Sequence, residues 1–178
     1  MENNNINNEN ENLTAQTGDN TKPRPESIWA PGVPANISDQ DKIGDAQLLD
    51  LAIKYVVDNV LISKGFMIEQ GFPRRDFPNV VCRKDGKVYS IIIIPSIFPG
   101  FKAISDSMRM KFVSLCEKQN ATPCFAPVGF RSEDDARANA SLVLKGDVFK
   151  ITFPGFLILD NREKLDYRNI TIDDYFRP

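Results

Sequence analysis

Four consecutive isoleucines, residues 91–94, are the feature of this sequence that most constrains its fold. An unbroken apolar run is typical of a strand covered on both faces, whereas a strand with one solvent face alternates apolar and polar residues. The run belongs to a predicted hairpin with strands over 79–83 and 87–94, in which Asp85 and Gly86 favour a tight turn. We therefore expect an α/β protein with strand 87–94 at the centre of its sheet.

A helix is predicted before the hairpin, over residues 41–64. Ser38 and Asp41 have the spacing of a capping box at its start, and Gly65 ends it. Its apolar residues recur at helical spacing: Leu49, Ile53, Val56, Val57 and Val60. A short strand is expected next, over residues 66–70.

A second amphipathic helix is predicted after the hairpin, over residues 103–119. It leads to a strand over 123–130, and a crossover of this length favours a strand parallel to 87–94. A third helix is expected from Ser132 and Asp135, another capping-box spacing, through about Leu144. The remaining predicted strands cover residues 148–153 and 156–159.

These elements make one α/β domain, over residues 38–160, between two segments of different composition. Residues 1–37 are rich in Asn, Glu, Thr and Pro, and such a segment buries too little apolar surface to order itself, so we expect a disordered tail. Trp29 in that tail is the only tryptophan, and is predicted to dock either on the domain itself or on a protein partner. Residues 161–178 form a polar carboxyl-terminal extension whose expected docking residues are Ile170, Ile172, Tyr175 and Phe176.

Composition excludes several classes of protein. There is no apolar stretch long enough to span a membrane and no secretory signal pattern, so we expect a cytoplasmic protein. The three cysteines form no CxxC pair, which favours buried reduced thiols over a disulfide framework or structural zinc. The chain has no histidine, which removes Ser-His-Asp and Cys-His hydrolases and histidine-ligated metalloenzymes.

The order helix, strand, hairpin, crossover helix, strand, helix resembles that of the PD-(D/E)XK nuclease superfamily. The resemblance covers residues 43–160 and implies a restriction-endonuclease-like three-layer core, with a central mixed β-sheet flanked by helices. In that family a Pro-Asp pair opens the second strand and a D/E-x-K triplet lies on the third, where the acids hold magnesium and the lysine helps to activate water.

Both signature positions lack charge here. Pro78 is followed by Asn79, and residues 89–96 of the third strand contain neither acid nor lysine. The sequence therefore predicts a degenerate member of the family without a metal or other cofactor, and it favours a protein that is not an enzyme. Glu69, Asp76 and Asn79 are the residues from which a relocated metal site could be built.

Charge is uneven along the chain. Residues 64–118 contain 10 Lys and Arg against 5 acids, although the whole chain carries −2. Arg74, Arg75, Lys84 and Lys87 are the candidate contacts to phosphates if the domain binds DNA or RNA. A solvated surface of mixed charge is the alternative.

Three functions follow from these observations. The first is a non-catalytic nuclease-like module that acts through protein binding, as a subunit, adaptor or inhibitor, with Trp29 as a candidate anchor. The second is a protein that binds nucleic acid without cleaving it, and the third is a metal-dependent nuclease with relocated acids. We favour the first; the sequence does not indicate the oligomeric state.

Overall fold

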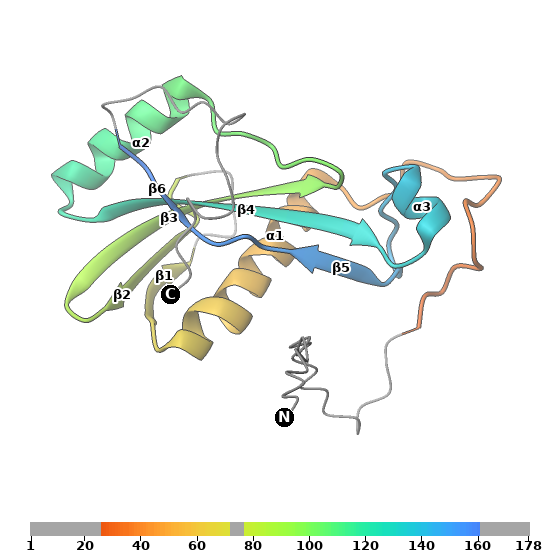
Figure 1. Ribbon diagram of the computed structural model, residues 1–178, viewed down its shortest axis with the longest axis horizontal. Helices are drawn as coiled ribbons and strands as arrows, with labels where there is room; N and C mark the ends of the chain where they lie inside the picture. Colours follow the sequence, from red (N-terminus) through yellow and green to blue (C-terminus); the bar gives the residue numbers. More distant parts are fainter. Residues whose placement is uncertain (1–25, 72–76, 161–178) are drawn as a thin grey trace, which may run out of the picture.

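The computed structural model describes residues 26–71 and 77–160, which form a six-stranded mixed sheet with helices on both faces (Figure 1). The expectation of an α/β fold with a central mixed sheet is confirmed. Along the sheet the strand order is β1-β2-β3-β4-β5, and β6 also pairs with β4. The strands are β1 (Met67–Gly71), β2 (Val80–Lys84), β3 (Lys87–Ile97), β4 (Thr122–Ser132), β5 (Phe149–Thr152) and β6 (Leu157–Ile158).

The isoleucine run lies in β3, the middle strand. β3 pairs antiparallel with β2 and parallel with β4, as expected from the hairpin and the long crossover. Ile91 and Ile93 face the core beneath the first helix, whereas Ile92 faces a second core beneath the crossover helix. The prediction of a central strand covered on both faces is confirmed, because successive side chains of a strand point to opposite faces.

The first helix begins later than its capping-box spacing indicated. α1 (Asp45–Tyr55) starts after Gly44, while the Ser38 hydroxyl and backbone N–H both bind the Asp41 carboxylate in a turn that precedes the helix. The helical path continues through a π-helical turn (Val56–Leu61) and a 3-10 turn (Ile62–Lys64). It ends at Gly65, whose φ of +78° is the left-handed conformation that glycine adopts without strain.

The crossover helix α2 (Asp106–Lys118) covers the opposite face of the sheet from α1 (Figure 1). Ser105 caps it by accepting a hydrogen bond from the Met108 N–H. The third helix is shorter than predicted: α3 spans only Asp135–Asn139 and is capped by Asp134. Ser132, which was predicted to cap this helix, is the buried last residue of β4, and its hydroxyl donates to the Asp147 carboxylate.

Part of the predicted tail contacts the domain. Trp29 donates its indole N–H to the Lys145 carbonyl at 2.7 Å, and the Ile28 N–H donates to the Gly146 carbonyl. Residues 28 and 29, which the sequence assigned to the tail that ends at residue 37, are therefore attached to the domain. Trp29 docks on its own domain, and its role as an anchor for a partner stays a prediction. Residues 1–25 lie outside the described part of the chain.

All three cysteines are buried free thiols, as expected. Desolvation raises the pKa of the Cys82 thiol to about 12 and that of the Cys116 thiol to about 11, and also raises the pKa of the Cys124 thiol. Each thiol is therefore protonated and poorly nucleophilic at neutral pH.

Candidate functional site

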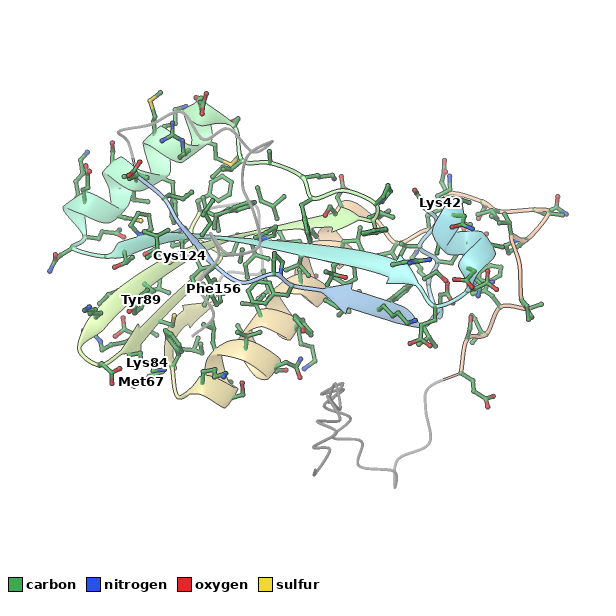
Figure 2. The ribbon with its side chains drawn as sticks, viewed as in Figure 1. Lys42, Met67, Lys84, Tyr89, Cys124 and Phe156 are labelled. Atoms are coloured by element: carbon green, nitrogen blue, oxygen red, sulfur yellow. The ribbon has the colours of Figure 1, made fainter. Side chains whose placement is uncertain are left out.

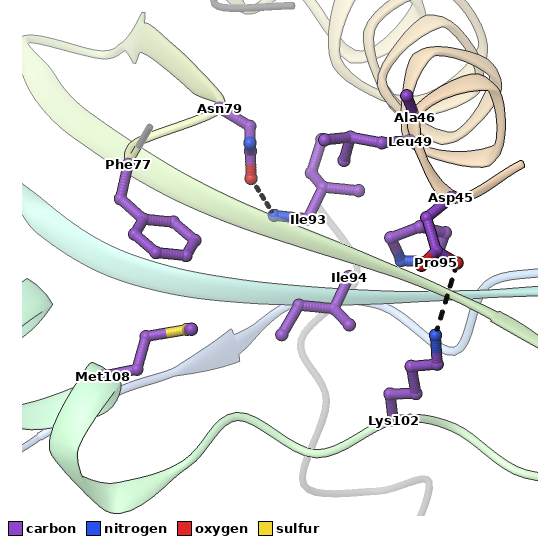
Figure 3. A pocket seen from close by; sticks show the side chains of 10 residues that line it. All are labelled: Asp45, Ala46, Leu49, Phe77, Asn79, Ile93, Ile94, Pro95, Lys102 and Met108. Atoms are coloured by element: carbon purple, nitrogen blue, oxygen red, sulfur yellow. Dashed lines mark hydrogen bonds and ion pairs between the residues drawn. The ribbon is translucent and has the colours of Figure 1, made fainter. Parts of the chain in front are cut away.

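Asn79 occupies the position at which the family resemblance would put a metal-binding aspartate. Its side chain is 1% exposed. The carboxamide oxygen accepts a hydrogen bond of 2.7 Å from the Ile93 N–H, and the Asn79 N–H donates to the Ile91 carbonyl at 2.9 Å (Figure 3). Asn79 therefore joins the start of β2 to β3, and its oxygen is already engaged within the protein.

A pocket of about 390 Å³ opens beside Asn79, between the start of α1, the second half of β3 and the first turn of α2 (Figure 3). Its wall is mainly apolar. The apolar side chains that line it are Ala46, Leu49, Phe77, Ile93, Ile94, Pro95 and Met108. Asp45 and Lys102 are the charged residues of the lining, so the pocket suits an apolar group more than a cation.

Two further hollows continue this pocket. One, of about 520 Å³, shares Phe77 and Met108 with it and runs along α2 to Phe112 and Leu115. The other, of about 320 Å³, shares Asp45 and Lys102 with it. Neighbouring hollows have lining residues in common, and we call the three adjoining hollows together the α2 groove. Its other lining residues are Leu48, Ser96, Ile97, Gly100 and Phe101 at one end, and Ser105, Ser107 and Lys111 along α2.

The charges around the α2 groove are two lysines and one acid. Lys102 lies 3.8 Å from Asp45, but both side chains are largely exposed, so solvent screens this pair and it contributes little to stability. Lys111 makes no ion pair with any described residue. A ligand with an apolar body and an acidic group would therefore match the groove in both polarity and charge.

The structure does not bring the candidate metal ligands together. Glu69 on β1 pairs with Arg83 at 2.6 Å, near the hairpin end of β2, whereas Asn79 lies at the opposite end of that strand. Asp76 lies outside the described residues. Within residues 26–71 and 77–160, no group of three His, Cys, Asp or Glu side chains could hold a metal ion.

The candidate phosphate contacts are also separated from the groove. Lys84 lies at the β2–β3 hairpin (Figure 2), where Lys87 is its cross-strand partner. The Lys84 ammonium lies 4.9 Å from the Phe66 ring centroid. Five residues of extended strand, about 17 Å, separate Asn79 from Lys84. Arg74 and Arg75 lie outside the described part of the chain, so their proposed role stays a prediction.

Sequence reasoning missed the groove itself. The apolar stripe of the second helix pointed to a buried face, and Ile104, Phe112 and Cys116 are indeed buried. Met108 and Leu115, at the edge of that stripe, are only half-buried and line the groove. No periodic signal marks Phe77 or Lys102, because they lie in irregular segments that only the fold brings beside α2.

Replacing Asn79 with alanine tests the structural role of its side chain. We expect Asn79→Ala to lower the free energy of unfolding by about 1–3 kcal/mol, since it leaves the buried Ile93 N–H without its acceptor. Chemical denaturation of the purified chain measures this, with Asn59→Ala, at an exposed position of the π-helical turn, as the control. Equal stability of Asn79→Ala and Asn59→Ala would contradict a structural role for the Asn79 side chain.

Comparison with known proteins gives a family and no function. A family model described as a domain of unknown function, DUF8840, matches residues 46–159. No curated protein and no solved structure matches the chain. Among the described residues, no helix is both long and apolar enough to cross a bilayer.

Proposed function

Because this chain belongs to the DUF8840 family of domains of unknown function, we propose its role from the α2 groove: it is a non-catalytic binding module that holds an extended peptide segment of a protein partner. The observation that carries the proposal is the apolar pocket beside the buried Asn79. A metal-dependent nuclease needs several oxygen ligands around its cation, and this pocket offers apolar side chains in their place.

The order of elements supports the same proposal. Helix, strand, hairpin, crossover helix and parallel strand follow one another as in the restriction-endonuclease-like core. In that comparison the α2 groove is the counterpart of the nuclease active site, with Asn79 after Pro78 in place of an aspartate. We propose that the cleft has kept its position while its lining has changed from acidic to apolar.

The shape of the groove favours a peptide over a compact small molecule. The α2 section alone, from Ser105 to Leu115, is about 15 Å long at the rise of a helix. Several adjoining hollows suit successive side chains of an extended segment, since pockets for alternate side chains give specificity in such complexes. Lys102 and Lys111 would pair with acidic residues of the partner, so we expect the bound segment to combine aromatic or aliphatic side chains with Asp or Glu.

Selection from a random peptide library displayed on phage tests this function. We expect the full chain to enrich peptides that carry apolar residues beside acids, and we expect synthetic copies of these peptides to bind with an affinity that falls as salt rises, because the lysines contribute screened electrostatic attraction. Fluorescence anisotropy measures the affinity. Absence of any enriched sequence, from both the natural chain and the Ile172→Asp/Phe176→Asp variant introduced below, would overturn the proposal.

The other two candidate functions, nucleic-acid binding and nuclease activity, are tested in parallel with labelled DNA and RNA. A nucleic-acid-binding protein would bind labelled DNA or RNA at low salt, and Lys84→Glu with Lys87→Glu would weaken that binding. A nuclease with relocated acids would cleave the labelled strands in manganese. Either result, without peptide binding, would replace the proposed function.

A further inference from the structure

The described chain ends beside α2, the helix that forms one wall of the α2 groove. Arg109, whose side chain is 4% exposed, donates a hydrogen bond to the Asp160 carbonyl and lies 3.4 Å from the Asp106 carboxylate. The Leu159 N–H also donates to the Pro123 carbonyl at 3.0 Å. Asp160 is therefore held against the first turns of α2. Its partner Arg109 follows Met108, which lines two hollows of the groove, but points about 100° away from it around the helix.

Enough chain follows Asp160 to reach every part of the groove. Residues 161–178 add 18 residues, which extend to at most about 60 Å. The α2 section of the groove is about 15 Å long. A segment tethered this close to a site is present at an effective concentration in the millimolar range, so even weak complementarity would favour binding.

The sequence of this segment matches the chemistry of the groove. It contains four large apolar residues close together, Ile170, Ile172, Tyr175 and Phe176. Asp173 and Asp174 lie between them, and residues 169–176 contain no Lys or Arg. The groove offers apolar hollows with Lys102 and Lys111 at their margins. Both the apolar character and the sign of charge are therefore complementary.

From these observations we propose that the α2 groove binds the chain's own residues 169–176, so that a partner peptide must displace them. This inference rests on the proposed function, since it describes how the same groove is regulated. The partner then needs the same combination of apolar and acidic side chains, and its apparent affinity is reduced by the fraction of molecules whose groove is already filled.

Paramagnetic relaxation in the full chain tests this. A nitroxide is attached to Pro178→Cys, which is labelled selectively because the three native thiols are buried and have raised pKa values. The signal of the Met108 methyl group is followed in protein labelled with ¹³C at methionine methyls. We expect this signal to lose most of its intensity, and to recover when Ile172→Asp and Phe176→Asp are introduced.

A second double variant is the matched control. Arg162→Gln with Lys164→Gln changes the charge of the tail by the same two units, but outside residues 169–176 and without removing an apolar side chain, so we expect the Met108 signal to stay weak. A Met108 signal of equal intensity in the natural chain and in Ile172→Asp/Phe176→Asp would overturn the inference.

The two proposals fail in different ways. If the tail binds the groove, a selected peptide should bind Ile172→Asp/Phe176→Asp about tenfold or more tightly than the natural chain. Equal peptide affinity, with an unaffected Met108 signal, would refute binding of the tail and leave the partner-binding function intact. Loss of the Met108 signal without any peptide binding would refute the partner-binding function and leave binding of the tail intact.

Discussion

Arg137→Met should lower the free energy of unfolding by about 3–5 kcal/mol, which would remove a large part of the stability of a domain of this size. The Arg137 side chain is 3% exposed and binds the Asp147 carboxylate, itself 1% exposed, through two hydrogen bonds of 2.9 and 3.1 Å. It also donates to the Ala30 and Gly32 carbonyls, each at 2.8 Å. Removing the guanidinium leaves a buried carboxylate and two backbone acceptors without this partner.

Urea denaturation of the natural chain and of Arg137→Met measures the loss of stability. Arg131→Met is the matched control. Arg131 makes an ion pair of 3.5 Å with Asp135, but the two side chains are 40% and 92% exposed. Exposed pairs contribute about 0–1 kcal/mol, so this control should be nearly as stable as the natural chain. Similar stability of Arg137→Met and Arg131→Met would show that the buried pair does not hold the amino-terminal segment to the domain.

The effect of Arg137→Met should also depend on pH. Burial by itself raises the pKa of Asp147, but hydrogen bonds from Ser132, Arg137, Ser27 and the Val148 N–H outweigh it, and the pKa is lowered. The carboxylate therefore adds stability above its unfolded pKa of about 3.9, and this stability is lost as the pH falls through the lower folded value. The difference in stability between the natural chain and Arg137→Met should be largest near pH 7 and shrink below about pH 4.

Met108→Glu should weaken binding of a selected peptide by about 30-fold or more, which corresponds to about 2 kcal/mol. Met108 lines both the pocket beside Asn79 and the hollow along α2. The substitution removes an apolar contact at the junction of the two hollows and places a negative charge where the proposed ligand is acidic. Anisotropy titration of the labelled peptide, in the Ile172→Asp/Phe176→Asp background, measures the change.

Met110→Glu is the matched control. Met110 belongs to the same helix, is 50% exposed and does not line the groove, because two residues along a helix turn the side chain by about 200°. We expect Met110→Glu to bind the selected peptide with an affinity within about twofold of that of the Ile172→Asp/Phe176→Asp background, since surface substitutions away from a contact rarely change the free energy by more than about 0.5 kcal/mol. Equal losses in the two variants would show that added charge, and not the groove, controls binding.

Local sequence signals predicted some ends of helices and strands correctly and others not. Gly65 and the Asp85–Gly86 turn end and connect elements where predicted, because their left-handed backbone conformations are local requirements. The two capping-box spacings were less informative. Ser38 does bind Asp41, but in a turn that precedes the helix, and the Ser132 hydroxyl donates to Asp147. The capping residues are Gly44 and Asp134 instead.

Hydrophobic periodicity within single elements predicts the α/β class and the central position of the isoleucine strand. The lack of a CxxC pair predicts the buried thiols. The position of a candidate binding site depends instead on contacts between elements that are distant in sequence. The α2 groove combines Asp45, Phe77, Lys102 and Met108 from three separate regions of the chain, while Lys84 and Lys87 lie at the β2–β3 hairpin. A cleft is a contact between elements distant in sequence, and no local pattern encodes which of their exposed side chains will meet.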